Sequence, residues 1–295
     1  MENTPRHMRL QRPAPTRRAL VRAGVLALGA GLAGDRGASA PAPTPQALPP
    51  LPLPSAGQVT PAQALPSRAD IVGAFAGQAP HYWGLEPPGA VLRLPPGTPG
   101  VALTIDFCGG PGGSDVDQAL LAALRERHIP ATLFLNARWI EANSETARQL
   151  AADPLFELAN HGTTHRPLST NGKSAYGIAG TQSTGEVYDE VMNNFAVLTQ
   201  LTGVRPRFFR PGTAFFDEIT AQIVGRLGHT PTGFSINADG GATYPAATVA
   251  REATKARPGD IIICHGNRPR GGTAQGMAQA LDTILKNGIP FVHLP

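Results

Sequence analysis

Residues 101–110 read VALTIDFCGG, a short apolar run that stops at an acidic residue and a pair of glycines. An apolar run of this length, bounded by turn-forming residues, is typical of a buried strand. Similar runs recur at 131–135, 155–159, 207–209, 233–236, 260–264 and 291–294. Helical spacing of apolar residues occurs between them, at 116–127, 138–151, 185–201, 216–227, 245–256 and 273–286. Strands that alternate with helices in this way predict an α/β fold built from parallel βαβ units.

The order of these elements fits a small or incomplete (β/α) barrel, and a doubly wound open sheet is the alternative that periodicity leaves open. In both architectures the reactive groups lie at the carboxyl ends of the strands. Polar residues do follow five of the predicted strands, namely Asp106, His161 with His165, Arg210, Asn237 with Asp239, and His265. A single such residue is more often a cap or a loop hydrogen-bond partner, but their repetition predicts a functional site.

The spacing of His161 and His165 places two imidazoles four positions apart, where both can bind one cation. Together with Asp106 they predict a divalent-metal site with nitrogen and oxygen ligands. This donor set suits zinc, and also cobalt, nickel or iron. Three protein ligands and one open position leave room for a water molecule of lowered pKa.

The basic character of the chain is concentrated at its start. The whole chain has a formal charge of +4, and residues 1–36 alone carry +5, so the remainder is close to neutral. A near-neutral remainder predicts no nucleic-acid partner. Residues 1–40 combine an arginine-rich start, a weakly apolar stretch and the small residues Ala38–Ala40, and Thr16–Arg22 resembles the twin-arginine consensus. We therefore expect an exported bacterial protein, periplasmic or secreted, with no integral membrane segment after signal removal.

Proline is concentrated after this signal, with 15 of the 30 prolines at positions 41–100. Residues 41–68 are predicted to form an extended linker, because proline disfavours helices and central strands. Residues 69–100 are predicted to be an N-terminal arm that packs on the domain, and residues 101–295 to be the domain itself.

The order of the polar motifs resembles that of the polysaccharide deacetylases, the NodB-homology group or carbohydrate esterase family 4. The matching motifs are Thr104-Ile-Asp106, His161-Gly-Thr-Thr-His165, Phe208-Phe-Arg-Pro211, a loop that contains Asp239, and Ile262-Ile-Cys-His265. The resemblance implies a distorted (β/α)7-type barrel. It also implies metal-dependent removal of acetyl groups from N-acetylated sugars of an extracellular or cell-wall polysaccharide, with His161 and His165 as metal ligands.

The same resemblance assigns the remaining catalytic roles. Asp106 matches the base that takes a proton from the attacking water, and Arg210 the residue that orients this base and keeps it ionised. His265 matches the general acid that protonates the departing amine, and Asp239 the acid that supports it. In addition, Ile263 is implied to line the pocket for the acetyl methyl group, and the N–H of Thr213 to donate to the oxyanion.

The chain departs from the family pattern at two places. Phe107 stands where the family has a second aspartate that binds the metal, so the third ligand is open between Asp106 itself, Asp115 or Asp117, and Cys108. Gly212-Thr213 stands where an aromatic residue is usual, which predicts a different sugar platform.

These departures keep two alternatives to a deacetylase open: a metal-poor glycan-binding pseudoenzyme, and a hydrolase of another non-peptide amide bond. The two cysteines, Cys108 and Cys264, are consistent with a disulfide, with free thiols or with Cys108 as a metal ligand. The sequence leaves the sugar polymer and the oligomeric state undetermined.

Overall fold

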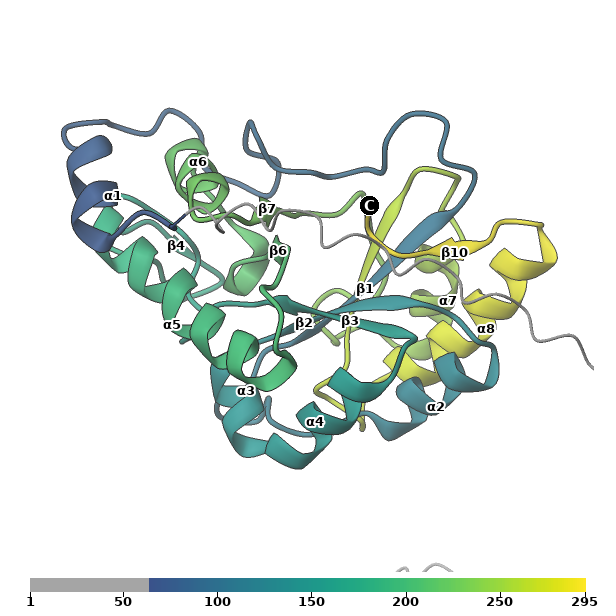
Figure 1. Cartoon of the computed structure of the whole chain (residues 1–295). Coiled ribbons are helices and arrows are strands. Elements are labelled where there is room, and N and C mark those ends of the chain that lie inside the picture. The colour runs from purple at the N-terminus through teal and green to yellow at the C-terminus, as the bar shows by residue number, and fades with distance from the viewer. Residues whose placement is uncertain (1–63) are drawn as a thin grey trace, which may run out of the picture. The chain divides into compact units, whose positions relative to one another are not determined.

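The computed structural model describes residues 64–295. The predicted signal peptide at 1–40 and the linker up to residue 63 lie outside the described residues. One parallel sheet has the strand order β7–β6–β3–β2–β1–β9–β8, and β10 pairs with the start of β1 (Figure 1). Its strands are β1 (Val101–Phe107), β2 (Ala131–Leu135), β3 (Phe156–Asn160), β6 (Phe208–Phe209), β7 (Thr230–Pro231), β8 (Ile236–Asn237), β9 (Ile261–His265) and β10 (Phe291–Val292).

Helices lie on the outside of this curled sheet (Figure 1), which confirms the predicted distorted (β/α)7-type barrel. They are α1 (Arg68–Ala74), α2 (Gln118–Glu126), α3 (Ala137–Ala142), α4 (Ser144–Ala152), α5 (Thr184–Thr202), α6 (Glu218–Arg226), α7 (Ala246–Ala253) and α8 (Thr273–Lys286). Helix α5 shows why these helices are readable from sequence. Its first turn is capped by the Ser183 hydroxyl, which accepts from the Glu186 N–H, and it ends at Gly203 in the left-handed conformation.

Several predicted elements differ from the observed ones. The predicted strand at 233–236 is displaced, because the chain forms two short strands, β7 and β8, on either side of it. The predicted helix at 138–151 is two helices that meet at Asn143, whose side-chain amide donates to the carbonyls of Ser114 and Trp139. A two-stranded hairpin, β4 (Ser174–Ala175) with β5 (Ile178–Ala179), was not predicted.

The central strand β1 is buried on both faces, as expected for a strand in a covered parallel sheet. Side chains on a strand alternate between its faces. Leu103, Ile105 and Phe107 belong to the core between the sheet and the outer helices, whereas Thr104 and Asp106 point to the interior of the barrel. Phe107 packs against Trp139 with ring centroids 4.6 Å apart. The alternation thus places residue 107 on the opposite side of the sheet from Asp106.

The segment before β1 pairs with the edge strand β7 and with the residues that precede β9. The Val91 N–H donates to Pro231 in β7, and the Val91 carbonyl accepts from Gly233, each at 2.8 Å. Further along, the Leu94 N–H donates to Gly259, just before β9. Residues 91–94 therefore lie between β7 and β9, across the opening of the barrel.

Helix α1 packs against α5 (Figure 1). Its residue Ile71 and the following Phe75 join Val187 and Val191 of α5 in a second apolar cluster. The N-terminal segment therefore contributes side chains to the buried core. Among residues 64–295, no helix combines the length and the apolar composition that crossing a bilayer requires.

His229 is a buried histidine that makes stability depend on pH. It lies against the rings of Phe195 and Phe209, and within the described part of the chain its Nδ1 atom has no hydrogen-bond partner. Burial lowers the pKa of His229 to about 4. The unfolded chain therefore takes up this proton near pH 6.5, whereas the folded chain takes it up only near pH 4, so acid favours unfolding.

We expect the His229→Gln variant to lose less stability than the parent between pH 7 and pH 4.5. The difference in unfolding free energy should be about 2 kcal/mol, measured by urea denaturation at both pH values. His293→Gln, which removes a histidine from the surface, is the matched control. An equal loss of stability in the His229→Gln variant and the parent would show that His229 is not the group responsible.

Candidate active site

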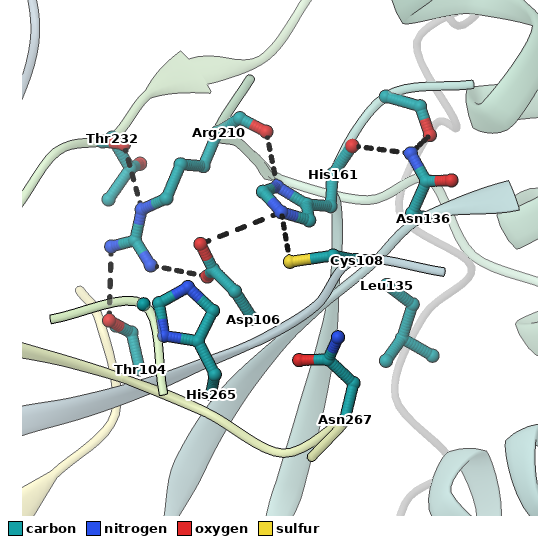
Figure 2. A network of polar contacts seen from close by, with 12 residues as sticks. Thr104, Asp106, Cys108, Leu135, Asn136, His161, Arg210, Thr232, His265 and Asn267 are labelled. Atoms are coloured by element: carbon teal, nitrogen blue, oxygen red, sulfur yellow. Dashed lines mark hydrogen bonds and ion pairs between the residues drawn. The ribbon is translucent and has the colours of Figure 1, made fainter. Parts of the chain in front are cut away.

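The site lies at the carboxyl ends of the strands, in a cavity of about 750 Å³. Asp106 at the end of β1 and His265 at the end of β9 are direct neighbours in the register of the two strands. The cavity is also lined by Cys108, His165 and Ile263. Figure 2 shows four of the side chains predicted at the strand ends, Asp106, His161, Arg210 and His265, close to one another.

Arg210 and Asp106 form a buried ion pair, with Nη1 of Arg210 2.7 Å from Oδ1 of Asp106. The Nη2 atom donates to the Thr104 hydroxyl and the Gly233 carbonyl, and Nε donates to the Thr232 carbonyl. Burial alone would raise the pKa of Asp106, but the positive charge of Arg210 and its hydrogen bond to the carboxylate outweigh it, and the pKa lies below its usual value. The carboxylate is therefore kept ionised in a dry environment.

The ring of His161 is oriented by the backbone of the same arginine (Figure 2). Its Nδ1 atom lies 2.8 Å from the Arg210 carbonyl, which can only accept, so Nδ1 carries the proton. The unprotonated Nε2 atom then faces Oδ2 of Asp106 at 3.6 Å and Sγ of Cys108 at 3.8 Å. Burial lowers the pKa of His161 and also that of His165, and both imidazoles are thereby kept neutral. Neutral, oriented imidazoles are suitable metal ligands.

Cys108 completes a group of three possible metal ligands. The donor atoms of Cys108, His161 and His165 all lie within 4.8 Å of one another. Burial and the nearby charges of Asp106 and Asp239 raise the pKa of the Cys108 thiol, so its thiolate needs a cation as partner. In a tetrahedral zinc site, sulfur and nitrogen ligands are roughly 3.6 Å apart, close to the observed separation of Sγ and Nε2. The residues present fit a divalent ion such as zinc.

The other candidates for the third ligand are placed differently. Phe107 lies in the core on the opposite face of the sheet, against Trp139. Asp117 caps helix α2, where its Oδ1 accepts from the Leu120 N–H at 3.1 Å. Neither Asp115 nor Asp117 is among the described residues that line the cavity. Of the alternatives left open by the sequence, only Asp106 and Cys108 therefore reach the site.

Both cysteines are free thiols, so the disulfide that their even number allowed is not formed. The reason is the alternation of side chains along β9. Cys264 lies in the core outside the sheet, whereas Cys108 lines the cavity inside the barrel. Two sulfurs on opposite faces of one sheet cannot pair without movement of the backbone.

His265 and Asp239 form a second charged pair. The Nδ1 atom of His265 lies 2.9 Å from Oδ1 of Asp239, and the His265 N–H donates to Oδ2 at 2.8 Å. Thr273 also donates to this buried carboxylate. Burial alone would lower the pKa of His265, but the negative charge of Asp239 outweighs it and the net effect is a raised pKa. His265 is thereby favoured as an imidazolium, which can donate a proton.

The sequence did not point to Glu190, a residue that shapes the site without lining it. This buried side chain of α5 accepts from the N–H of Thr164 at 2.9 Å and from the N–H of Arg166 at 3.2 Å, on either side of His165. It thus fixes the loop that presents the second imidazole. In the sequence, the only feature that could have indicated this role is the position of an acidic residue on the apolar face of a predicted helix.

The turn after Arg210 is also unusual. Thr213 and Ala214 have positive φ angles of 68° and 59°, which a β-branched residue such as Thr213 rarely adopts. The Thr213 hydroxyl has no hydrogen-bond partner among the described residues, and the residue lines the cavity. A Cβ atom on Gly212 would lie 2.2 Å from the His165 carbonyl oxygen, so the close approach of the two loops requires glycine there.

Comparison with known proteins agrees with this geometry. The sequence model of a family described as polysaccharide deacetylase matches residues 94–232. The uncharacterized protein YlxY of Bacillus subtilis (strain 168) is 23% identical over 219 residues, which cover 74% of this chain and 62% of YlxY. The chain therefore spans less than two thirds of that relative.

Two solved structures share the fold. The pseudoenzyme BA3943 from Bacillus anthracis, of the CE4 family, has a TM-score of 0.58 and 20% identity, over 70% of this chain and 67% of that one. The Bc1960 peptidoglycan N-acetylglucosamine deacetylase has a TM-score of 0.59 and 21% identity, over 70% of this chain and 91% of that one. At this level of identity they are evidence for the fold. With the family match at residues 94–232, they show that this part of the chain is similar to the polysaccharide deacetylases of carbohydrate esterase family 4.

Proposed function

We propose that this domain is a metal-dependent hydrolase that removes acetyl groups from N-acetylated sugars of an extracellular or cell-wall polysaccharide. One observation carries the proposal: an ionised carboxylate, Asp106, and a histidine with a raised pKa, His265, face one cavity from adjacent strands. A base and an acid held in opposite protonation states are what amide hydrolysis needs. Export by residues 1–40 is part of the same proposal.

Cys108, His161 and His165 would hold the divalent ion, zinc first, with cobalt, nickel or iron as alternatives. When bound, such an ion lowers the pKa of water and polarises the acyl oxygen. The donor set differs from that of the family pattern, because a thiolate at position 108 replaces the carboxylate expected at position 107. A thiolate is a softer ligand, so it favours zinc over magnesium, calcium or manganese.

The protein side chains move the protons. Asp106 accepts a proton from the attacking water, while Arg210 keeps the carboxylate oriented and ionised until that step. The water oxygen bonds to the acyl carbon, the carbon–nitrogen bond breaks, and His265 gives its proton to the departing amine. Asp239 stabilises the imidazolium before this transfer. Thr213 and Ile263 both line the cavity, where the N–H of Thr213 would donate to the oxyanion and Ile263 would offer an apolar wall for the methyl group.

A glycan-binding pseudoenzyme is the second candidate, and Phe107 favours it because the usual aspartate ligand is missing. BA3943, a protein of the same fold whose structure is known, is described as a pseudoenzyme. Metal content and acetate release separate the two candidates. A folded protein that takes up no zinc, and that releases no acetate from acetylated oligosaccharides, supports the pseudoenzyme. Release of ammonia or of a different carboxylate would instead indicate hydrolysis of another amide bond.

The first prediction concerns the base and a metal ligand. We expect Asp106→Asn and His161→Ala each to lower acetate release by at least about a hundredfold, because each removes a group needed for proton transfer or metal binding. The measurement is acetate released from N-acetylglucosamine oligomers by the zinc-loaded protein. The controls are Asp282→Asn and His293→Ala, which change surface residues of the same types. Full activity of Asp106→Asn would exclude the assigned mechanism.

The second prediction concerns the third ligand. Cys108→Ser should weaken zinc binding about ten- to a hundredfold, whereas Cys264→Ser, which changes the buried cysteine on the other face of the sheet, should leave it unchanged. Reconstitution with cobalt gives an independent readout, because a thiolate ligand produces a charge-transfer absorption band. If that band is absent from the parent protein and zinc binds equally to Cys108→Ser, then Cys108 is not a ligand and Asp106 becomes the remaining candidate.

The third prediction concerns pH. The negative charge of Asp239 raises the pKa of His265, so Asp239→Asn should lower that pKa. The acid form of His265 is then lost at lower pH, and the basic limb of the kcat/KM profile should move to lower pH. Asp189→Asn, which changes a more exposed aspartate, should leave the profile in place. A basic limb that does not move in Asp239→Asn would show that another group limits the reaction at high pH.

A further inference from the structure

We propose that Trp83, Phe215 and Tyr176 form a sugar-binding platform at the edge of the active-site cavity. It would stack against the pyranose rings next to the sugar that is deacetylated. The three residues come from the N-terminal arm, the loop before α6 and the β4–β5 hairpin. The ring centroid of Phe215 lies 5.7 Å from that of Trp83 and 5.4 Å from that of Tyr176. We call these three residues the aromatic platform; the inference rests on the proposed function and specifies its substrate as a chain of several sugars.

The backbone fixes the orientation of the central ring. Gly84 and Phe216 exchange two hydrogen bonds, at 3.1 and 2.9 Å, which join the arm to the loop before α6. On the other side, the Leu168 N–H donates to the carbonyl of Phe215. Phe216 is fully buried beneath this junction. Since Phe215 precedes it in extended backbone, its ring points the opposite way and is only partly buried.

The arm is held in place next to Trp83. The carboxylate of Glu218, in the first turn of α6, accepts from the N–H groups of His81 and Tyr82 at 2.6 and 2.9 Å. A carboxylate in this position is also favoured by the partial positive charge of the helix N-terminus. The residue that follows, Trp83, is thereby brought beside Phe215 rather than left on a free segment.

Packing within the fold does not account for the aromatic side chain of Tyr176. Its side chain is 75% exposed, and it stands with Gly177 in the two-residue turn of the hairpin, with φ angles of 53° and 77°. Turns with two positive φ angles favour asparagine, aspartate or glycine, and a bulky aromatic residue is strained there. An exposed ring in a strained position gains little from folding. Such strain is typical of residues retained for binding.

The aromatic platform meets the cavity at Tyr176. Tyr176 and Ile178 of the hairpin and Leu85 of the arm are among the residues that line the cavity around Asp106 and His265. A glycan with one sugar at the reactive side chains would therefore run onto these rings. The apolar C–H face of a pyranose is complementary to the negative face of an aromatic ring. The aromatic platform would replace the aromatic residue that Gly212-Thr213 lacks.

The decisive variant is Tyr176→Asn, because asparagine suits the turn while it removes the ring. We expect its unfolding temperature to equal or exceed that of the parent. Its KM for the N-acetylglucosamine hexamer should rise about tenfold, whereas the KM for single N-acetylglucosamine, which has no neighbouring ring to stack, should change much less. The matched control is Val204→Asn, which removes an exposed apolar side chain that does not line the cavity. An equal effect on the single sugar and the hexamer, or none on the hexamer, would overturn the aromatic platform.

A binding measurement separates failure of this inference from failure of the proposed function. The chain has two tryptophans, and Trp139 is fully buried, so fluorescence changes caused by added hexamer should come from Trp83. If the protein releases no acetate, quenching by the hexamer that is lost in Tyr176→Asn still supports the aromatic platform. Absence of quenching in the parent, at concentrations up to several millimolar, contradicts it.

Discussion

The burial of Arg210 beside Asp106 is the interaction on which the rest of the site depends. A guanidinium and a carboxylate removed from water are costly to bury unless their remaining donors and acceptors are satisfied. Here the guanidinium donates to Thr104 and to carbonyls after β7, and lies over the ring of Phe134 in β2. The carbonyl of the same arginine sets the tautomer of His161. Arg210 therefore fixes the base Asp106, the proposed metal ligand His161 and the relative positions of the inner strands.

Much of this arrangement can be predicted from the sequence. The long helices follow from apolar spacing and clear caps, as in α5, and the strand ends follow from apolar runs that stop at polar residues. The two-residue strands β7 and β8 could not be placed from sequence. Strands this short carry almost no periodicity, and their positions depend on pairing with β6 and β9. Glu190 was also missed, because its partners are the backbone groups of a loop distant in sequence.

The choice between positions 107 and 108 shows a different limit. Whether Phe107 or Cys108 faces the cavity depends on the residue at which strand β1 ends and the alternation of its side chains stops. After Phe107 the backbone turns through Gly109 and Gly110, both with positive φ angles. The sulfur of Cys108 is thereby directed to the two histidines, while the ring of Phe107 remains in the core. The sequence gives the order of these residues, but the turn at Gly109 and Gly110 decides which side chain points into the cavity.

The pairing of the arm with β7, at one edge of the sheet, has a consequence for association between molecules. The terminal strands of an open sheet present unpaired N–H and carbonyl groups, which can pair with the edge of another molecule. In this barrel Val91 of the arm occupies such groups in and directly after β7, at Pro231 and Gly233. The segment that precedes the domain therefore also acts as protection against edge-to-edge aggregation, a role separate from any contribution to catalysis.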